Sequence, residues 1–361
     1  MDFSLVFVEL YQSVLGKEKN FFYVEDERIR AAIQNMKEVY MPNPLWQANP
    51  ALTVADYNDP SHRCAYLHKY AMCYTGMVCD LLQGAISESN DIYELINSKR
   101  RLRLCSLGGG PGTDVLGSLA AIFACCQYIP CSVSVLDFYA QQWKITFDML
   151  IKELRSGVSH GLKEMVSAPQ FKYEFMYANL LSDVETNPQV RQIVSAADII
   201  TMVKFISAAA CQATSRMVQA VFNSMQPGAM LIFIDNAAGG FQEMVQQAAL
   251  QCGMLTLYGP LLHHDYENAN YSLNRFSYTS QSKTKVAFHI WWKPYTSSNN
   301  TTRGLRNDFF SYNRLHEQGE QNVRVSRPKN RSRSKNRNRS RNRSRGRQQE
   351  QDAEGGCCSI I

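Results

Sequence analysis

The stretch Leu102–Gly117 reads LRLCSLGGGPGTDVLG, and it decides the fold class of this 361-residue chain. A short apolar run, typical of a buried strand, leads into a glycine-rich turn, and apolar residues at helical spacing follow. Gly108, Gly110 and Gly112 alternate with other residues, a spacing that suits positive φ angles and close approach of a ligand to the main chain. A helix starting there offers free N–H groups to a polar ligand. The stretch predicts a strand, a ligand-binding turn and a helix, with a purely structural turn as the alternative.

Short apolar runs continue after this turn, and helical stretches such as 141–154 and 240–252 separate most of them. Strand–helix alternation implies right-handed crossovers and a parallel sheet. The last two runs have no helix between them, so we expect them to pair antiparallel at one end of the sheet. The predicted fold class is α/β, a Rossmann-like seven-stranded sheet with a terminal antiparallel strand. The runs are 101–107, 132–137, 173–178, 197–203, 229–235, 254–259 and 286–292.

Composition divides the chain into three parts. Residues 1–100 show helical periodicity and predict a helical N-terminal extension, with one helix expected to end at Gly84 as its C-cap. Residues 101–295 hold the strand–helix alternation and predict the ligand-binding domain. Residues 296–361 are poor in apolar side chains and rich in Arg, Ser and Asn, which predicts a disordered basic tail.

Polar residues stand at the predicted ends of the second and third strands. Asp137 ends SVSVLD, where a carboxylate suits both hydroxyls of a ribose. Asn179 follows the third strand, where its amide suits an adenine edge while Leu180 packs on the ring. The alternatives are an acid that caps the next helix and an ordinary turn asparagine. Because open parallel sheets bind ligands at the carboxyl ends of their strands, the turn and these residues together indicate an adenosine-containing ligand.

At these residues the chain resembles the class I S-adenosylmethionine-dependent methyltransferases. Their glycine motif matches SLGGGPG, except that Ser106 stands where they carry an acid that helps to hold the methionine end. Their turn before the fifth strand matches QPGAMLIFID. The resemblance spans about Leu102–Lys293 and implies S-adenosylmethionine as cofactor. The residues that it implies for cofactor binding are Ser106, Gly108, Gly109, Gly110, Gly112, Asp137, Asn179 and Leu180.

An NAD-type Rossmann enzyme is the competing interpretation, because it also uses a glycine turn and a ribose-binding acid. The predicted antiparallel final strand argues against it. The predicted function is therefore a methyltransferase with RNA or protein favoured as acceptor, and the alternative is a catalytically inactive binding module of the same fold. A segment with Tyr66, Lys69 and Tyr70 would form a lid over the cofactor or simply pack in the core. A sealed site would favour the inactive module.

No catalytic signature accompanies the cofactor motifs. After the fourth strand the chain reads TMVKFIS, without the Pro-Pro-aromatic motif of amino-group methylases. Lys204 in this run is a candidate for holding substrate or the cofactor carboxylate, with a solvated lysine as the alternative. Segment 261–283 is predicted to be a long loop at the cofactor edge, and His263, His264 and Tyr266 in it are candidate substrate contacts or bases. An exposed polar connection is the alternative for this segment.

The net charge of +6 is unevenly distributed along the chain. Residues 324–347 contain ten Arg, two Lys and no acid, whereas residues 1–323 carry a net charge of −3. This basic arm predicts binding to phosphates, either of RNA or of an anionic membrane surface. A solvated tail without a dedicated partner is the alternative.

The chain ends in CCSII, which resembles a prenylation box at Cys358 with a second lipidation site at Cys357. The same ending resembles a carboxylate ligand for PDZ domains, and a chance ending is the third interpretation. We expect a cytoplasmic protein that prenylation holds at a membrane, with the nucleus as the alternative. The N-terminus lacks the pattern of a secretion signal. The eleven cysteines lack zinc-ligand spacing, so we expect no bound metal and mostly buried, reduced thiols.

Overall fold

The computed structural model describes residues 2–39, 55–157 and 159–295. Within these residues, seven strands form one mixed sheet in the order β3-β2-β1-β4-β5-β9-β6. The strands from β3 to β5 are parallel, and β9 pairs antiparallel with both β5 and β6. The strands are β1 (Leu102–Leu107), β2 (Cys131–Asp137), β3 (Lys172–Tyr177), β4 (Ile199–Val203), β5 (Met230–Asn236), β6 (Leu255–Glu267) and β9 (Lys283–Trp292). This strand order is that of the class I methyltransferase fold, and the predicted fold class is confirmed.

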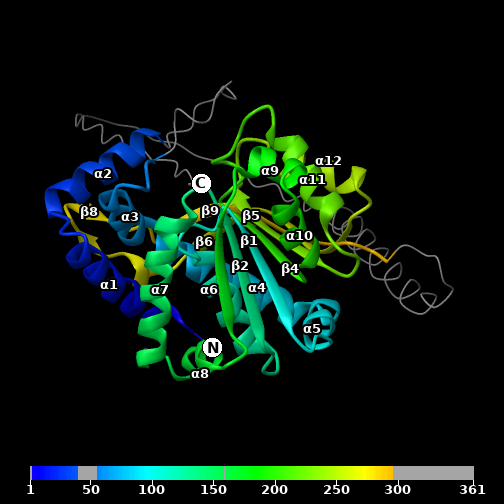
Figure 1. Cartoon of the computed structure of the whole chain (residues 1–361), viewed down its shortest axis with the longest axis horizontal. Coiled ribbons are helices and arrows are strands. Elements are labelled where there is room, and N and C mark those ends of the chain that lie inside the picture. The colour runs from blue at the N-terminus through cyan, green and yellow to red at the C-terminus, as the bar shows by residue number, and fades with distance from the viewer. Residues whose placement is uncertain (1, 40–54, 158, 296–361) are drawn as a thin grey trace, which may run out of the picture. The chain divides into compact units, whose positions relative to one another are not determined.

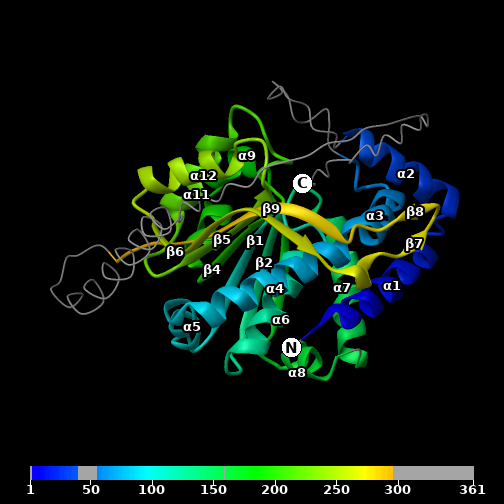
Figure 2. The same cartoon turned by 180° about the vertical axis from the view of Figure 1, so that it is seen from behind.

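The two faces of the sheet are buried under different helices (Figures 1 and 2). Side chains alternate along a strand, so Ile232 and Ile234 of β5 enter one core while Leu231 and Phe233 enter the other. The first core is covered by α6 (Thr113–Cys125), α7 (Ala140–Ser156) and α8 (His160–Ser167). The second is covered by α9 (Leu180–Thr186), α10 (Pro188–Ala196), α11 (Thr214–Ser224) and α12 (Phe241–Gln251).

The N-terminal region is helical, as the sequence predicts, and it completes the first core. Its helices are α1 (Ser4–Phe21), α2 (Asp26–Val39), α3 (Pro60–Tyr66), a π-helical turn (Leu67–Ala71), α4 (Met72–Glu88) and α5 (Asn90–Asn97). α4 lies along α6 at a close approach, since a Cβ at Gly117 would lie 2.5 Å from the Thr75 carbonyl oxygen. The expectation that a helix ends at Gly84 is wrong. α4 continues to Glu88 because Ala85 and Ile86 are buried in the core.

The prediction of a long loop over 261–283 is also wrong for its first part, residues 261–267. β6 continues through these residues to Glu267, and only 268–282 connect it to β9. β6 is an edge strand with register shifts against β9. Polar side chains such as His263 and His264 face solvent on such an edge without cost, so a strand here resembles a loop in its sequence. The connection holds a short turn (Ala269–Tyr271) and the hairpin β7 (Asn274–Arg275) and β8 (Tyr278–Thr279).

The predicted tail, 296–361, lies outside the described residues, and with it lie the basic arm 324–347 and the lipidation candidates Cys357 and Cys358. The cysteines of the described part of the chain are all free thiols. No helix of that part is long and apolar enough to cross a membrane, and no three of its His, Cys, Asp or Glu side chains gather as metal ligands would.

Candidate functional site

The glycine turn joins β1 to α6 at the carboxyl edge of the sheet. Gly108, Gly110 and Gly112 have φ angles of 65°, 52° and 80°, the left-handed region that glycine adopts most easily. The turn is tight, because the Gly112 N–H donates to the Gly109 carbonyl oxygen at 2.8 Å. A Cβ at Gly108 would also lie 2.3 Å from Cδ2 of Phe205. The main chain of the turn therefore requires glycine for its conformation and, at Gly108, for space.

Asp137 ends β2 beside this turn and is fully buried. Its Oδ2 accepts the Gly110 N–H at 3.0 Å, and its Oδ1 accepts the Tyr139 N–H at 2.7 Å. Burial raises the pKa of this carboxyl to about 6, although both backbone donors oppose the rise. The acid that the sequence indicates for a ribose is thus in contact with the glycine turn, and it also caps the chain after β2.

Asn179 and Leu180 follow β3, the next strand along the edge. The Asn179 N–H donates to Oδ2 of Asp183 at 2.8 Å, and its carbonyl oxygen accepts the N–H groups that begin α9. The residue is exposed and Leu180 is buried. Strand pairing places this turn beside Asp137, because the Ala178 N–H donates to the Asp137 carbonyl oxygen at 3.1 Å. Both sequence-predicted strand ends therefore meet at one edge with the glycine turn.

A second acid, beneath the turn, was missed by the sequence analysis. Asp114, in the first turn of α6, is 1% exposed. Its Oδ2 accepts the Ser106 hydroxyl at 2.7 Å and the Thr201 hydroxyl at 2.5 Å. Burial raises the pKa of Asp114, and the two hydroxyl donors oppose the rise. The available signal was the Thr-Asp pair directly after the glycines, next to a serine in the place of an acid.

Aromatic side chains of the N-terminal region and α7 cover the turn. The indole of Trp143 packs against Gly110 and is 1% exposed, with the rings of Tyr57 and Tyr66 at 4.6 and 5.4 Å between centroids. Among the described residues, the Trp143 indole N–H has no hydrogen-bond partner. A buried donor without an acceptor is costly, so this N–H is a group that a ligand at the turn would satisfy.

The candidate lid residues lie within this cover. Tyr66 and Tyr70 are buried, and Lys69 donates from Nζ to the Thr279 carbonyl oxygen at 2.6 Å. The Gln281 N–H in turn donates to the Lys69 carbonyl oxygen at 2.8 Å. The π-helical turn is thus hydrogen-bonded to the hairpin region. The segment covers the site and also packs in the core, so each of the two interpretations describes part of its environment.

Lys204 follows β4 and is 2% exposed, so the solvated alternative is wrong. Its φ angle is 54°, unusual for a residue with a side chain. Its Nζ donates to Oδ1 of Asn236 at 2.6 Å and to Oγ1 of Thr284 at 3.1 Å, below the ring of Tyr74. Burial raises the pKa of the neighbouring Asp235, and the charge of Lys204 opposes that rise. The side chain crosses the ends of β4, β5 and β9, away from β1.

His263, His264 and Tyr266 are not brought to the glycine turn. They lie on β6, and four strand positions separate β6 from β1, about 19 Å at the usual strand spacing. The Tyr266 hydroxyl is buried and donates to Oδ2 of Asp80 at 2.9 Å. Burial and the nearby acid raise the pKa of Tyr266, which favours the protonated phenol.

A cavity of about 280 Å³ lies beside the site, where β2 and β3 end and α7 begins. The half-exposed rings of Phe138 and Tyr177 lie 5.3 Å apart between centroids on its wall. Amide side chains supply most of its polar groups. The residues that line it are Asn58, Phe138, Tyr139, Ala140, Gln141, Gln142 and Tyr177.

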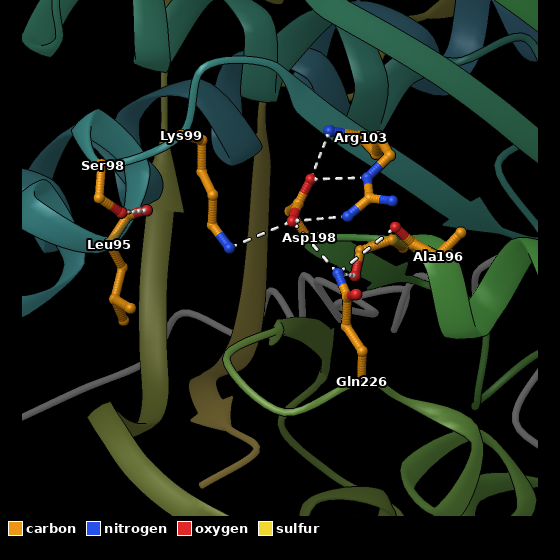
Figure 3. Close-up of polar contacts among 8 residues, drawn as sticks. Leu95, Ser98, Lys99, Arg103, Ala196, Asp198 and Gln226 are labelled. Carbon is orange, nitrogen blue, oxygen red and sulfur yellow. Dashed lines mark hydrogen bonds and ion pairs between the residues drawn. The ribbon is translucent and has the colours of Figure 1, made fainter. Parts of the chain in front are cut away.

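The opposite, amino edge of the sheet carries charges of another kind (Figure 3). Asp198, just before β4, accepts hydrogen bonds from the Arg103 guanidinium and main chain, from Lys99 and from Gln226. Burial raises the pKa of Asp198, but the hydrogen bonds of Arg103 and the charge of Lys99 outweigh it, and the pKa is lowered. This cluster connects the ends of neighbouring strands and has a structural role.

Comparisons with known proteins find only distant similarity. No family model matches the chain, and no curated protein matches it. Solved structures match at low identity. An O-methyltransferase family protein from Burkholderia thailandensis is 12% identical over 66% of this chain and 62% of its own, with a TM-score of 0.39. The CurJ carbon methyltransferase is 12% identical over 68% and 61%, with a TM-score of 0.37. A SAM-dependent methyltransferase from Methanosarcina mazei is 14% identical over 56% and 99%, with a TM-score of 0.31.

The chain spans about three fifths of the length of the first two of these structures. At such similarity the matches do not identify a substrate or an activity. The class of the fold rests on the strand order and on the antiparallel position of β9.

Proposed function

We propose that this protein binds S-adenosylmethionine at the glycine turn and transfers its methyl group to an acceptor. The observation that carries the proposal is the contact between Asp137 and Gly110 at 3.0 Å, in a turn whose glycines are left-handed. It joins the two groups that the sequence resemblance assigns to the cofactor. The residues present fit this cofactor, since the Trp143 N–H, which has no partner among the described residues, and the bare main chain of Gly110 face the same place.

In this function, Asp137 would hold the ribose hydroxyls, and the Gly110 main chain would lie against the cofactor. When bound, S-adenosylmethionine supplies a methyl group on a sulfonium, which is already a strong electrophile. The chain itself has to orient the acceptor and exclude water. The aromatic cover with Trp143 and Tyr66 suits the exclusion of water. Lys204, buried at the ends of β4 and β5, suits the orientation of an acceptor oxygen through its positive Nζ.

A second candidate function is the catalytically inactive module of the same fold. It is favoured by the tight packing at the turn, because the ring of Phe205 lies directly on Gly108 and the turn glycines are buried among the described residues. Both carboxylate oxygens of Asp137 also accept main-chain N–H groups already. A module of this kind would bind without transferring a methyl group.

The acceptor belongs to the proposal as well, with RNA or protein favoured. The basic arm 324–347 supports an anionic partner by its composition, either RNA or a membrane surface, and a PDZ domain remains the proposed partner of the C-terminus. Lipidation of Cys358 and Cys357 would place the protein at a cytoplasmic membrane surface, and an RNA-bound arm would be compatible with the nucleus. A fluorescent carrier fused to the tail tests location, and an unchanged distribution of the Cys358→Ser variant would exclude the lipid.

The test of the function uses the full chain with methyl-labelled S-adenosylmethionine. Calorimetry first measures binding, and no binding by the unaltered protein refutes both candidate functions. Incubation with cell extract then follows the label into RNA, protein or small molecules. Transfer that is lost in Asp137→Ala supports the methyltransferase. Binding without transfer to any fraction supports the inactive module.

A further inference from the structure

The acid beneath the glycine turn has a well-defined environment. Asp114 receives hydroxyl donors from two different strands, Ser106 at the end of β1 and Thr201 in β4, at 2.7 and 2.5 Å. All three residues are at most 1% exposed. Its other oxygen, Oδ1, accepts the Val115 N–H at 2.9 Å. No cation of the part of the chain that the structure describes is among these partners, and the carboxylate is held there by hydrogen bonds.

The carboxylate also lies directly under the main chain of the turn. A Cβ at Gly109 would lie 1.9 Å from Oγ of Ser106 and 3.1 Å from Oδ1 of Asp114. The turn therefore rests on the serine hydroxyl and the acid, with no layer between them. A ligand that lies against the outer side of this turn is separated from the negative charge by the thickness of one peptide chain.

The charge changes what the N-terminus of α6 offers to a ligand. A helix N-terminus with free N–H groups attracts anions such as a pyrophosphate. An acid in the first helical turn compensates that partial positive charge, and in a buried setting the negative charge is weakly screened. The turn of this chain thus presents bare main chain over a net negative site, which favours a positively charged ligand and disfavours a phosphate.

An independent observation points to a ligand position at the same turn. The Trp143 indole N–H is buried against Gly110, on the outer side, and lacks an acceptor among the described residues. A ligand there would need a hydrogen-bond acceptor for this N–H, which a ribose hydroxyl or a carboxylate of an amino-acid group supplies.

We propose that Asp114 is the specificity-determining charge of this site, and that it selects a cationic, sulfonium-bearing cofactor over pyrophosphate-bearing dinucleotides. In this role it supplies from α6 the negative charge that Ser106 lacks at the end of β1. The proposal rests on the proposed function, because it concerns the ligand of the same turn. Asp114 positions the turn, and its charge discriminates between ligands. It takes part in no chemical step.

The test measures dissociation constants of S-adenosylmethionine, S-adenosylhomocysteine and NAD⁺ by calorimetry. S-Adenosylhomocysteine lacks the sulfonium charge but keeps every other group except the methyl. In Asp114→Asn the affinity ratio of S-adenosylmethionine to S-adenosylhomocysteine should fall about tenfold, the effect of losing one nearby opposite charge. Loss of packing alone would weaken both ligands equally and leave the ratio unchanged. Asp198→Asn removes a buried acid at the opposite edge and should leave both constants unchanged.

The exchange variant Ser106→Asp with Asp114→Ser returns the acid to the end of β1 and should keep the wild-type ratio within about twofold, since the charge stays beneath the turn. It decides the question where Asp114→Asn fails to fold. Three results would overturn the proposal. They are an affinity ratio in folded Asp114→Asn equal to that of the wild type, a lowered affinity ratio in the exchange variant, and binding of NAD⁺ by the unaltered protein. Absence of binding of both adenosyl ligands to the unaltered protein instead refutes the proposed function.

Discussion

The buried pair of Glu18 in α1 and Arg63 in α3 lies within the N-terminal extension, where Thr146 of α7 also contacts Glu18, and its removal gives the sharpest prediction about stability. The two side chains are 0% and 2% exposed, with Arg63 Nε donating to Glu18 Oε1 at 2.6 Å. The Arg63 Nη1 also donates to the carbonyl oxygens of Tyr57 and Asn58 at 2.8 and 3.1 Å. Arg63→Met therefore leaves one buried carboxylate without its cation and two carbonyl groups without a donor.

The size of the effect follows from these contacts. Breaking a buried pair by removing one partner costs about 3–5 kcal/mol, a large part of the ~5–15 kcal/mol that stabilises a domain. The double variant Glu18→Leu with Arg63→Met removes both charges and should recover ~2 kcal/mol or more of the loss. Some cost remains, because the two carbonyl groups and the Thr146 hydroxyl, which donates to Glu18 at 3.2 Å, lose their partners.

Urea unfolding followed by tryptophan fluorescence measures these free energies, and extrapolation to water compares the variants. Burial raises the pKa of Glu18 even with Arg63 present, and it should rise further without the cation. A group whose pKa is raised on folding contributes stability at low pH that is lost as the pH increases. The cost of Arg63→Met should thus be smaller at pH 5 than at pH 8. A loss below ~1 kcal/mol in the single variant, or simple additivity in the double variant, would refute the reasoning.

Three further predictions concern the two edges of the sheet and the helix packing. Asp137→Ala should weaken S-adenosylmethionine binding by ~2 kcal/mol or more. Binding by the wild-type protein should strengthen as the pH rises through about 6, where the Asp137 carboxylate forms, and pH-dependent calorimetry measures both effects. Asp198→Asn should cost ~2 kcal/mol at pH 7. Because the pKa of Asp198 is lowered on folding, its contribution to stability is lost in acid, and the difference between the two urea curves should shrink as the pH falls below 3.8, the ordinary pKa of an aspartic acid. Gly117→Ala should lower the melting temperature by several degrees, since its Cβ would lie 2.5 Å from the Thr75 carbonyl oxygen; an unchanged temperature would show that α4 shifts freely on α6.

The sequence predicted the sheet well because parallel strands leave a strong local pattern. Short apolar runs between helical stretches identified all the strands of the large sheet, and the missing helix before the last run gave its antiparallel direction. It failed at β6, because an edge strand with one face toward solvent carries polar residues such as His264 without penalty. It failed at Gly84 because core packing of the following residues outweighed the local preference of glycine to end a helix.

The candidate site was predicted only in part for a different physical reason. Residues at strand ends, such as Asp137, are predictable because the topology alone brings them to one edge. Asp114 was missed because its importance depends on which hydroxyls surround it, and those come from β1 and β4, 8 and 87 residues away. The burial of Lys204 likewise depends on Thr284, 80 residues further along the chain, and on a ring of α4. The contacts with Thr201 and Thr284, 80 or more residues away, leave no trace in local sequence.

The electrostatics of the two sheet edges argue for which edge is functional. At the amino edge, Asp198 is buried but surrounded by cations, and its pKa is lowered, so folding stabilises its charge. At the carboxyl edge, Asp114, Asp137 and Asp235 are buried with raised pKa values, so folding there works against each charge. Stability alone does not favour three such carboxylates along one edge, two of which, Asp114 and Asp137, lie at the glycine turn. Groups whose ionisation is strained in this way concentrate where a protein binds ligands or does chemistry, and a cationic ligand at the turn would relieve Asp114 and Asp137.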